Sequence, residues 1–249
     1  MSKVIIITGS EGVLGSEISR YLKNKKYFII DIDIKNVARK NYFKCNINNE
    51  SQVKKIINKI TKRFKKIDVL INCASFNPKQ KKLKEFKLSS YPIKNWKKNI
   101  EIDTIGTFII TKHTLKVFEK NNNGKIINIS SNYGMVGPDQ DIYYENNKKK
   151  YFGKKPVEYS LAKSATIGVT RSMAAFYKNT DINIFCLLLG GITGDETLRF
   201  SKDYAKKTII GRMMKKNEYN QIIENFIKHK SDFLSGSIID LSGGSLSII

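Results

Sequence analysis

The sequence predicts an α/β fold in which helices cover both faces of a doubly wound parallel sheet. Short apolar runs typical of buried parallel strands alternate with amphipathic helical patterns along the chain. The first apolar run leads directly into a glycine-rich turn and a helix. The three irregular stretches, residues 76–94, 135–156 and 191–212, each follow a strand pattern. They would therefore lie at the sheet edge where such folds bind ligands.

The elements follow one another in a regular order. Strands are expected at residues 3–9, 27–33, 67–75, 124–131, 182–190 and 236–244, and helices at 10–24, 50–64, 95–118, 157–177 and 217–230. The helix at 50–64 has the clearest pattern, because Val53, Ile57 and Ile60 share one face. Alternation of strands and helices implies right-handed crossovers and a parallel sheet. Without a repeat or a linker, residues 1–249 are expected to form one domain.

The composition narrows the class of protein. The 45 Lys+Arg and 22 Asp+Glu residues give a formal net charge of +23. Lys, Asn and Ile are all abundant, which is typical of an AT-rich genome. The positive charge is then explained by lysines on solvated surfaces, and we expect no nucleic-acid partner. A basic nucleic-acid-binding module is the alternative.

Location and metal content are also constrained. No apolar run reaches the roughly 20 residues that span a membrane, and the N-terminal stretch lacks a signal-peptide pattern. We expect a cytoplasmic protein without membrane contact. Cys45, Cys73 and Cys186 lie in or beside apolar segments, which favours reduced, buried thiols. His113 and His229 lie far apart in sequence, so no metal site is expected.

The stretch "TGSEGVLG" joins the first strand to the first helix. Gly9, Gly12 and Gly15 recur at every third position. Glycine allows a sharp turn and a close approach of the backbone to a pyrophosphate, whose charge the helix N-terminus favours. The strand–turn–helix context is the one in which this pattern indicates dinucleotide binding.

An acidic residue follows at the expected distance. Asp33 lies 18 residues after Gly15, at the end of the second strand pattern. A carboxylate there can bind a ribose 2′-hydroxyl and repel a 2′-phosphate, which favours NAD over NADP. Asp31 is the competing candidate. Lys35 follows closely and keeps NADP as the alternative cofactor.

Tyr159 and Lys163 lie four residues apart on a predicted helix, so both side chains project from one face. The unperturbed pKa of tyrosine is near 10, and a base near neutral pH needs it lower by roughly 2–3 units. An ammonium ~5 Å away contributes about 3 kcal/mol at an effective dielectric constant of ~20. Lys163 is therefore suited to make Tyr159 a proton acceptor.

Four stretches together resemble the short-chain dehydrogenases/reductases over nearly the whole chain: "TGSEGVLG", "INCAS" (71–75), "IINISSNYG" (126–134) and "YSLAK" (159–163). The resemblance implies a Rossmann-like fold and an NAD(P)-dependent alcohol or carbonyl oxidoreductase that forms a homodimer or homotetramer. It assigns catalysis to Ser131, Tyr159 and Lys163, and it aligns Asp103 with the asparagine of the family's catalytic tetrad. The cofactor residues that it implies are Gly9, Ser10, Gly12, Val13, Leu14, Gly15, Asp33, Asn46, Ile47, Asn72, Cys73, Ala74, Tyr159, Lys163, Gly190, Gly191, Ile192 and Thr193.

Several positions depart from the family pattern. Val13 replaces the loop's middle glycine, Ser75 the glycine of N-x-A-G, and Leu189 the proline of a Pro-Gly pair. Asp103 replaces an asparagine, whose neutral amide both donates and accepts hydrogen bonds. An ionised aspartate only accepts hydrogen bonds, and it carries a negative charge. We expect Asp103 to compete with Tyr159 for the field of Lys163 and to shift oxidation to higher pH. A cofactor-binding homologue without catalysis is the alternative of another class.

Ser131 and Tyr159 lie 28 residues apart, which is wider than the family's usual spacing. The inserted stretch resembles a subgroup found with bacterial surface-glycan and flagellin-modification genes. That resemblance implies a sugar, sugar phosphate or nucleotide sugar as the small-molecule substrate, with another carbonyl or an acyl thioester as the alternative. The basic stretches 79–87 and 148–155 could attract an anionic substrate, or they reflect the lysine content alone.

Overall fold

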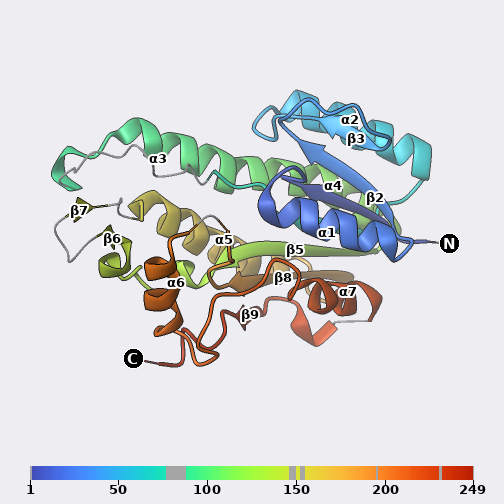
Figure 1. The fold of residues 1–249 in the computed structure, drawn as a ribbon. Coiled ribbons are helices and arrows are strands. Elements are labelled where there is room, and N and C mark those ends of the chain that lie inside the picture. Colours follow the sequence, from blue (N-terminus) through green and yellow to red (C-terminus); the bar gives the residue numbers. More distant parts are fainter. Residues whose placement is uncertain are drawn as a thin grey trace.

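A seven-stranded parallel sheet forms the centre of the computed structural model, which describes residues 2–76, 88–145, 150–151, 155–194, 196–229 and 232–248 (Figure 1). Its strand order is β3-β2-β1-β4-β5-β8-β9. The strands are β1 Val4–Thr8, β2 Phe28–Asp33, β3 Tyr42–Lys44, β4 Val69–Asn72, β5 Asn123–Ser131, β8 Asp181–Leu189 and β9 Ile238–Leu241. The order reverses between β1 and β4, so the sheet is doubly wound, as the sequence predicts.

Helices cover both faces of the sheet. Helices α1 (Val13–Asn24) and α7 (Asn220–Lys228) pack on one face, and α2 (Glu50–Phe64), α4 (Thr107–Asn121) and α5 (Val157–Phe176) pack on the other. Because side chains alternate along a strand, β1 serves both layers. Its Ile5 and Ile7 join the cluster under α1 and α7, while Val4 and Ile6 join the opposite cluster.

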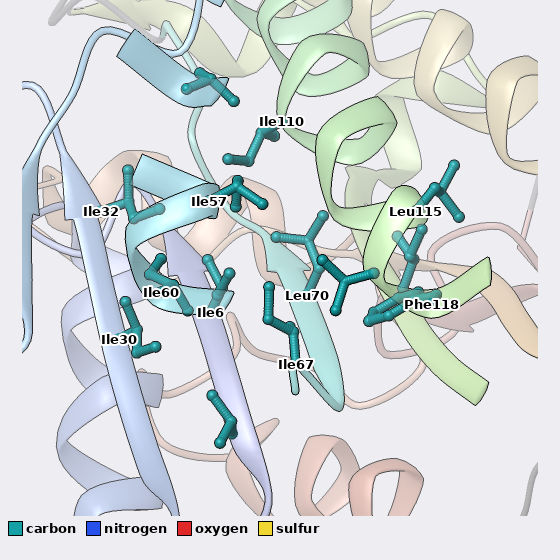
Figure 2. Close-up of a cluster of buried hydrophobic side chains, with 14 of the residues drawn as sticks. Ile6, Ile30, Ile32, Ile57, Ile60, Ile67, Leu70, Ile110, Leu115 and Phe118 are labelled. Carbon is teal, nitrogen blue, oxygen red and sulfur yellow. The ribbon is translucent and has the colours of Figure 1, made fainter. Parts of the chain in front are cut away.

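The second of these clusters is shown in close-up in Figure 2. Isoleucines of β1 and β2 face Ile57 and Ile60 of α2, and Leu70 of β4 lies between them and α4. From α4, Leu115 and Phe118 pack into the same layer. The sheet is therefore buried on both faces, which accounts for its unbroken apolar strand segments.

The helical stretch before β5 differs from the prediction. The pattern over 95–118 predicts one regular helix, whereas the structure has α3 (Ile93–Ile100), a π-helical segment η2 (Glu101–Gly106) and then α4. A π-turn inserts an extra residue into the helix, and such insertions are frequent at functional sites. Asp103 lies in this wider segment, where its side chain is buried.

Short elements also lie within the stretches interpreted as irregular. Helix α6 (Leu198–Ala205) lies within 191–212 and is capped by Thr197, whose side chain accepts the backbone N–H of Phe200. It is held by tertiary packing of Tyr204 against Ile142 and Met213, which a local pattern does not show. The other short elements are η1 Leu88–Ser90, η3 Asn132–Gly134, η4 Gln140–Tyr143, η5 Asp232–Leu234 and the antiparallel pair β6 Tyr144–Glu145 and β7 Lys150–Tyr151.

All three cysteines carry free thiols, with Cys45 and Cys186 buried and Cys73 half-buried. Within the described ranges, no helix is both long and apolar enough to cross a lipid bilayer. The basic stretch 79–87 lies outside the described residues, as does most of 148–155.

We predict that Phe118→Ala lowers the free energy of unfolding by about 3–5 kcal/mol, because it removes a fully buried ring from the core. The ring also fills the space that a side chain on Gly124 would need. Phe176→Ala is the matched control, since that ring is 87% exposed, and it should change the value by about 0.5 kcal/mol or less. Equal losses in urea denaturation would contradict this packing.

Candidate active site

Three of the predicted catalytic residues meet at the carboxyl edge of the sheet. Ser131 is the last residue of β5, and Tyr159 and Lys163 lie in the first turns of α5. The hydroxyl of Ser131 donates to Oδ1 of Asn132 at 3.1 Å and lies close enough to the phenol of Tyr159 to lower its pKa. The chain thus brings together a hydrogen-bond donor, a phenol and an ammonium that lie up to 32 residues apart in sequence.

Close packing of α5 on β5 produces this arrangement. The hydroxyl of Ser130 donates to the carbonyl oxygen of Lys163 at 2.8 Å. Gly134 lies so close to α5 that a Cβ there would be 2.8 Å from the carbonyl carbon of Lys163. Seven residues further along α5, Thr170 accepts a hydrogen bond from the side-chain amide of Asn128 of β5 at 2.9 Å.

The electrostatic environment of Tyr159 favours its deprotonated form. Burial would raise the pKa of the phenol, but the ammonium groups of Lys155 and Lys163 and the nearby hydroxyl of Ser131 outweigh burial. Asp103 opposes them, and the pKa of Tyr159 nevertheless lies below the ordinary value of 10.0. A tyrosine in this environment is a better proton acceptor near neutral pH than an ordinary one.

Lys163 is buried and has two oxygen partners. Its Nζ lies 3.4 Å from Oδ1 of Asp103 and 3.4 Å from the carbonyl oxygen of Ile129. Burial alone would lower the pKa of Lys163, but the charges of Asp103 and Tyr159 outweigh it and raise the pKa. The ammonium therefore keeps its proton throughout the physiological range.

Asp103 reaches Lys163 and is held on both carboxylate oxygens. Oδ1 accepts the hydroxyl of Ser75, and Oδ2 accepts the backbone N–H of Phe76 at 2.7 Å. Ser75 and Asp103 are two of the departures from the family pattern, and the structure shows that they contact each other. The hydroxyl that replaces a glycine thus helps to stabilise the buried carboxylate.

Lys155 is a site residue that the sequence interpretation missed. Its Nζ lies 3.6 Å from the centroid of the Tyr159 ring, compared with 5.7 Å for Lys163. It precedes α5, whose N-cap is Pro156, so no helical spacing connects it to Tyr159. The lysine-rich stretch offered no signal that would single out this residue.

The glycine-rich loop makes a tight turn in which the backbone packs closely. Gly9 has a φ of +65°, and a Cβ there would be 2.7 Å from Cα of Ala74. The N–H of Gly12 donates to the carbonyl oxygen of Gly9 at 2.9 Å, and a Cβ at Gly15 would collide with that same oxygen. Only glycine fits at Gly9 and Gly15 without a shift of the backbone.

The N-terminus of α1 is open for an anion. Its N-cap Gly12 provides no side-chain hydrogen bond, and the first turn contains no acidic residue. Beside it, the buried hydroxyl of Ser10 has no hydrogen-bond partner among the described residues. Unsatisfied N–H groups, the helix dipole and an unpaired hydroxyl together fit a dinucleotide pyrophosphate. Of the adjacent helix residues, Val13 is exposed and Leu14 packs partly against the core.

The structure separates the two aspartates of β2. Asp31 is fully buried and accepts hydrogen bonds from Ser19, Lys23 and Arg39 at 2.7, 2.5 and 3.0 Å. Asp33 instead accepts the backbone N–H of Glu11, in the glycine-rich loop, at 2.9 Å. Asp33 is therefore the carboxylate that borders the loop. Asp31 instead connects β2 to helix α1 and to Arg39.

Asn72, Cys73 and Ala74 support the sheet next to the loop. The hydroxyl of Thr8 accepts the N–H groups of Cys73 and Ala74, each at 3.2 Å. The amide of Asn72 donates to Asn128 at 2.8 Å and lies within the buried layer. The structure therefore gives the Asn72 side chain a supporting position between strands.

The remaining predicted cofactor residues border the same edge. Gly191 donates its N–H to the hydroxyl of Tyr204 and accepts the N–H of Met214 at 2.9 Å, while Thr193 donates to Met214 at 2.8 Å. These contacts fix the segment 190–193 after β8. Beyond β3, Asn46 is exposed, whereas the side chain of Ile47 belongs to the core.

Known proteins resemble this chain over most of its length. The family model described as short chain dehydrogenase matches residues 3–205. A 3-oxoacyl-(acyl-carrier-protein) reductase FabG of Thermotoga maritima is 22% identical over 260 residues, covering 97% of this chain and 97% of the relative.

Two solved structures show the same fold. A short chain dehydrogenase from Leptospira borgpetersenii with bound NAD+ has a TM-score of 0.86 at 23% identity, covering 98% of this chain and 93% of that one. A Thermoplasma acidophilum aldohexose dehydrogenase has a TM-score of 0.80 at 20% identity, covering 100% and 95%.

We predict that Gly134→Ala lowers the free energy of unfolding by about 1–3 kcal/mol, because the new methyl group overpacks the contact between η3 and α5. Gly137→Ala is the control, since nothing lies within 4 Å of a Cβ at that position. It should leave stability unchanged or slightly higher. Chemical denaturation of both variants checks the contact, and equal stabilities would contradict it.

Proposed function

Because the chain belongs to the short-chain dehydrogenase family, we propose that it is an NAD(P)-dependent oxidoreductase that moves a hydride between the nicotinamide and an alcohol or carbonyl substrate. One observation carries the proposal. The phenol of Tyr159, with a lowered pKa, lies beside two lysines on the same sheet edge as the open N-terminus of α1, which can hold an anion.

In this proposal each residue of the cluster has a defined task. When bound, the nicotinamide cofactor supplies the hydride chemistry. Ser131 donates a hydrogen bond to the substrate oxygen, where negative charge develops. Tyr159 takes the proton of the alcohol in oxidation and returns it in reduction. Lys163 stabilises the phenolate and holds the nicotinamide ribose.

The residues that would hold the cofactor fit it in shape and charge. The open N-terminus of α1 and the hydroxyl of Ser10 suit the pyrophosphate. Asp33, which borders the loop, suits a ribose 2′-hydroxyl, so NAD is the expected cofactor and NADP the alternative. The fixed segment 190–193 suits the nicotinamide carboxamide.

For the substrate we propose a sugar, sugar phosphate or nucleotide sugar. The insert before α5 and the similarity to an aldohexose dehydrogenase support this choice. The similarity to FabG favours a second candidate, the reduction of an acyl thioester. A substrate panel of sugars, sugar phosphates and acyl thioesters, followed by nicotinamide absorbance, distinguishes the two. Absence of turnover with every substrate, with cofactor still bound, would instead favour a homologue without catalysis.

We also propose that residues 1–249 form one domain that assembles as a homodimer or homotetramer in the cytoplasm. Exposed apolar side chains on η2, α4 and α5, among them Ile105, Phe108 and Leu161, support assembly. The three free thiols support a reducing compartment. Light scattering of the purified protein tests the assembly.

We predict that Tyr159→Phe lowers kcat by about 10²–10⁴-fold, because the ring is kept but its proton-carrying hydroxyl is lost. Cofactor affinity, measured by calorimetry, should stay within a few-fold of the wild type. A variant that retains a tenth of the wild-type kcat would remove Tyr159 from this role.

We predict that Asp33→Ala narrows the preference for NAD over NADP by about tenfold, because the carboxylate that repels a 2′-phosphate is gone. Asp31→Ala is the matched control. It should lower stability, since it leaves Lys23 and Arg39 without their buried partner, but it should keep the cofactor ratio. Calorimetric dissociation constants for both cofactors give the ratio. Equal affinities in the wild type would contradict the role of Asp33.

A further inference from the structure

The charges around Tyr159 differ from the arrangement that the family pattern implies, in which a neutral asparagine and one lysine lie near the tyrosine. The carboxylate of Asp103 lies 3.4 Å from Nζ of Lys163, so the two opposite charges form a buried pair. Such a pair has no net charge, and its field at a neighbouring group is weaker than that of an ammonium alone. Lys163 by itself is therefore a weakened activator of Tyr159 in this chain.

A second lysine lies nearer to the ring. Burial lowers the pKa of Lys155, while the charges of Tyr159 and Asp103 oppose that lowering and favour the ammonium form. Nζ of Lys155 lies 3.6 Å from the centre of the Tyr159 ring, closer than that of Lys163. The side chain of Gln140 holds the backbone of Lys155 on both sides, accepting its N–H at 3.0 Å and donating to its carbonyl oxygen at 3.4 Å. Pro156, the N-cap of α5, follows directly. The position of this lysine is thus fixed by the insert and by the start of the helix.

We propose that Lys155 is a positioning residue whose ammonium offsets the negative charge of Asp103, so that the Tyr159 phenolate is stabilised by a net positive charge. This inference rests on the proposed function, in which Tyr159 exchanges the proton with the substrate. Asp103, Lys163 and the protonated form of Lys155 then act as one charge cluster with a positive charge in excess.

The other titratable groups that face this cluster are neutral. Burial raises the pKa values of Tyr133, Tyr143 and Tyr204, the phenols that interact with Tyr159. The thiols of Cys73 and Cys186 face Lys163, and burial raises the pKa of each to about 12. None of these groups carries charge near neutral pH.

The nearby carboxylates have other partners. Glu158 precedes Tyr159 but accepts the hydroxyl of Tyr91 at 2.5 Å. Asp139, on the segment before η4, pairs with Lys207 at 2.8 Å. Among the described residues, the charges that the phenol of Tyr159 senses most strongly are those of Lys155, Lys163 and Asp103.

The signs of the expected changes follow from these charges. Loss of the Lys155 ammonium removes stabilisation of the phenolate, so the pKa of Tyr159 rises and proton uptake needs a higher pH. Loss of the Asp103 charge removes repulsion, so the pKa falls. Loss of both leaves the field of Lys163 alone and returns Tyr159 close to its wild-type titration.

The test needs no substrate. Tyrosinate absorbance is titrated in the wild type, Lys155→Gln, Asp103→Asn and the double variant. The curve of the same protein carrying Tyr159→Phe is subtracted from each, which leaves the titration of Tyr159. We expect Lys155→Gln to move the Tyr159 midpoint up by about one pH unit or more, and Asp103→Asn to move it down. The double variant should lie within about half a unit of the wild type, and Lys155→Arg should retain the wild-type midpoint.

Lys25→Gln is the matched control, because Lys25 also lies over a tyrosine ring, 5.4 Å from the centroid of Tyr21, on the distant helix α1. It should leave the Tyr159 midpoint unchanged. An unchanged midpoint in Lys155→Gln would overturn the proposal, as would equal shifts in the Lys25 control.

The pH profile of kcat/KM for oxidation gives the catalytic counterpart. Its acidic limb should move with the phenol midpoint in each variant. A rise in KM at every pH without movement of this limb would make Lys155 a substrate anchor and overturn the proposal. Absence of turnover in the wild type would overturn the proposed function, whereas the absorbance titration still decides the arrangement of charges.

Discussion

The contact between helix α5 and the end of strand β5 determines the geometry of the candidate site. Ser130 and Asn128 of the strand hydrogen-bond Lys163 and Thr170 of the helix, and Gly134 closes the gap beyond the strand end. Each such bond contributes about 1 kcal/mol to stability, but a buried polar group that lost its partner would cost more. A shift of α5 along β5 would break them together, so Tyr159 is held in one register against Ser131.

A buried ionic cluster is tolerated here because its members are well bonded. Removing two charges from water is expensive, and their attraction repays it only when further hydrogen bonds satisfy the remaining atoms. Asp103 has such bonds from Ser75 and from the N–H of Phe76, and Lys163 has the carbonyl oxygen of Ile129. The π-helical segment η2 contains Asp103, so the local widening of the helix and the buried charge occur at the same place.

The sequence predicts those features that depend on local pattern and order. The amphipathic face of residues 50–64 matches helix α2 at both ends, and the glycine-rich loop lies where the first strand and helix place it. Strand β3 was missed because three residues are too few for a periodic signal, and the insertion in η2 leaves the apolar pattern of a helix nearly unchanged.

Contacts between distant residues account for what the sequence could not show in the site. Ser75 and Asp103 are both visible as unusual residues, but they lie 28 positions apart and only the fold brings them together. Lys155 is one lysine among many, and its contact with Tyr159 depends on how Gln140 holds the insert. Composition conceals such a residue, because no spacing distinguishes it from solvated neighbours.

The charges of Asp103 and Lys155 shift the pKa of Tyr159 in opposite directions, and the site needs both of them. A base works best when its pKa lies near the operating pH, because both the deprotonated fraction and the strength of the base then remain high. Asp103 with a neutral residue at position 155 would raise the pKa of the phenol and so reduce its deprotonated fraction. Lys155 with a neutral residue at position 103 would stabilise the phenolate so strongly that it would accept a proton less readily. The insert that carries Lys155 and the helix segment that carries Asp103 are therefore parts of one electrostatic unit, although one lies before α5 and the other before α4.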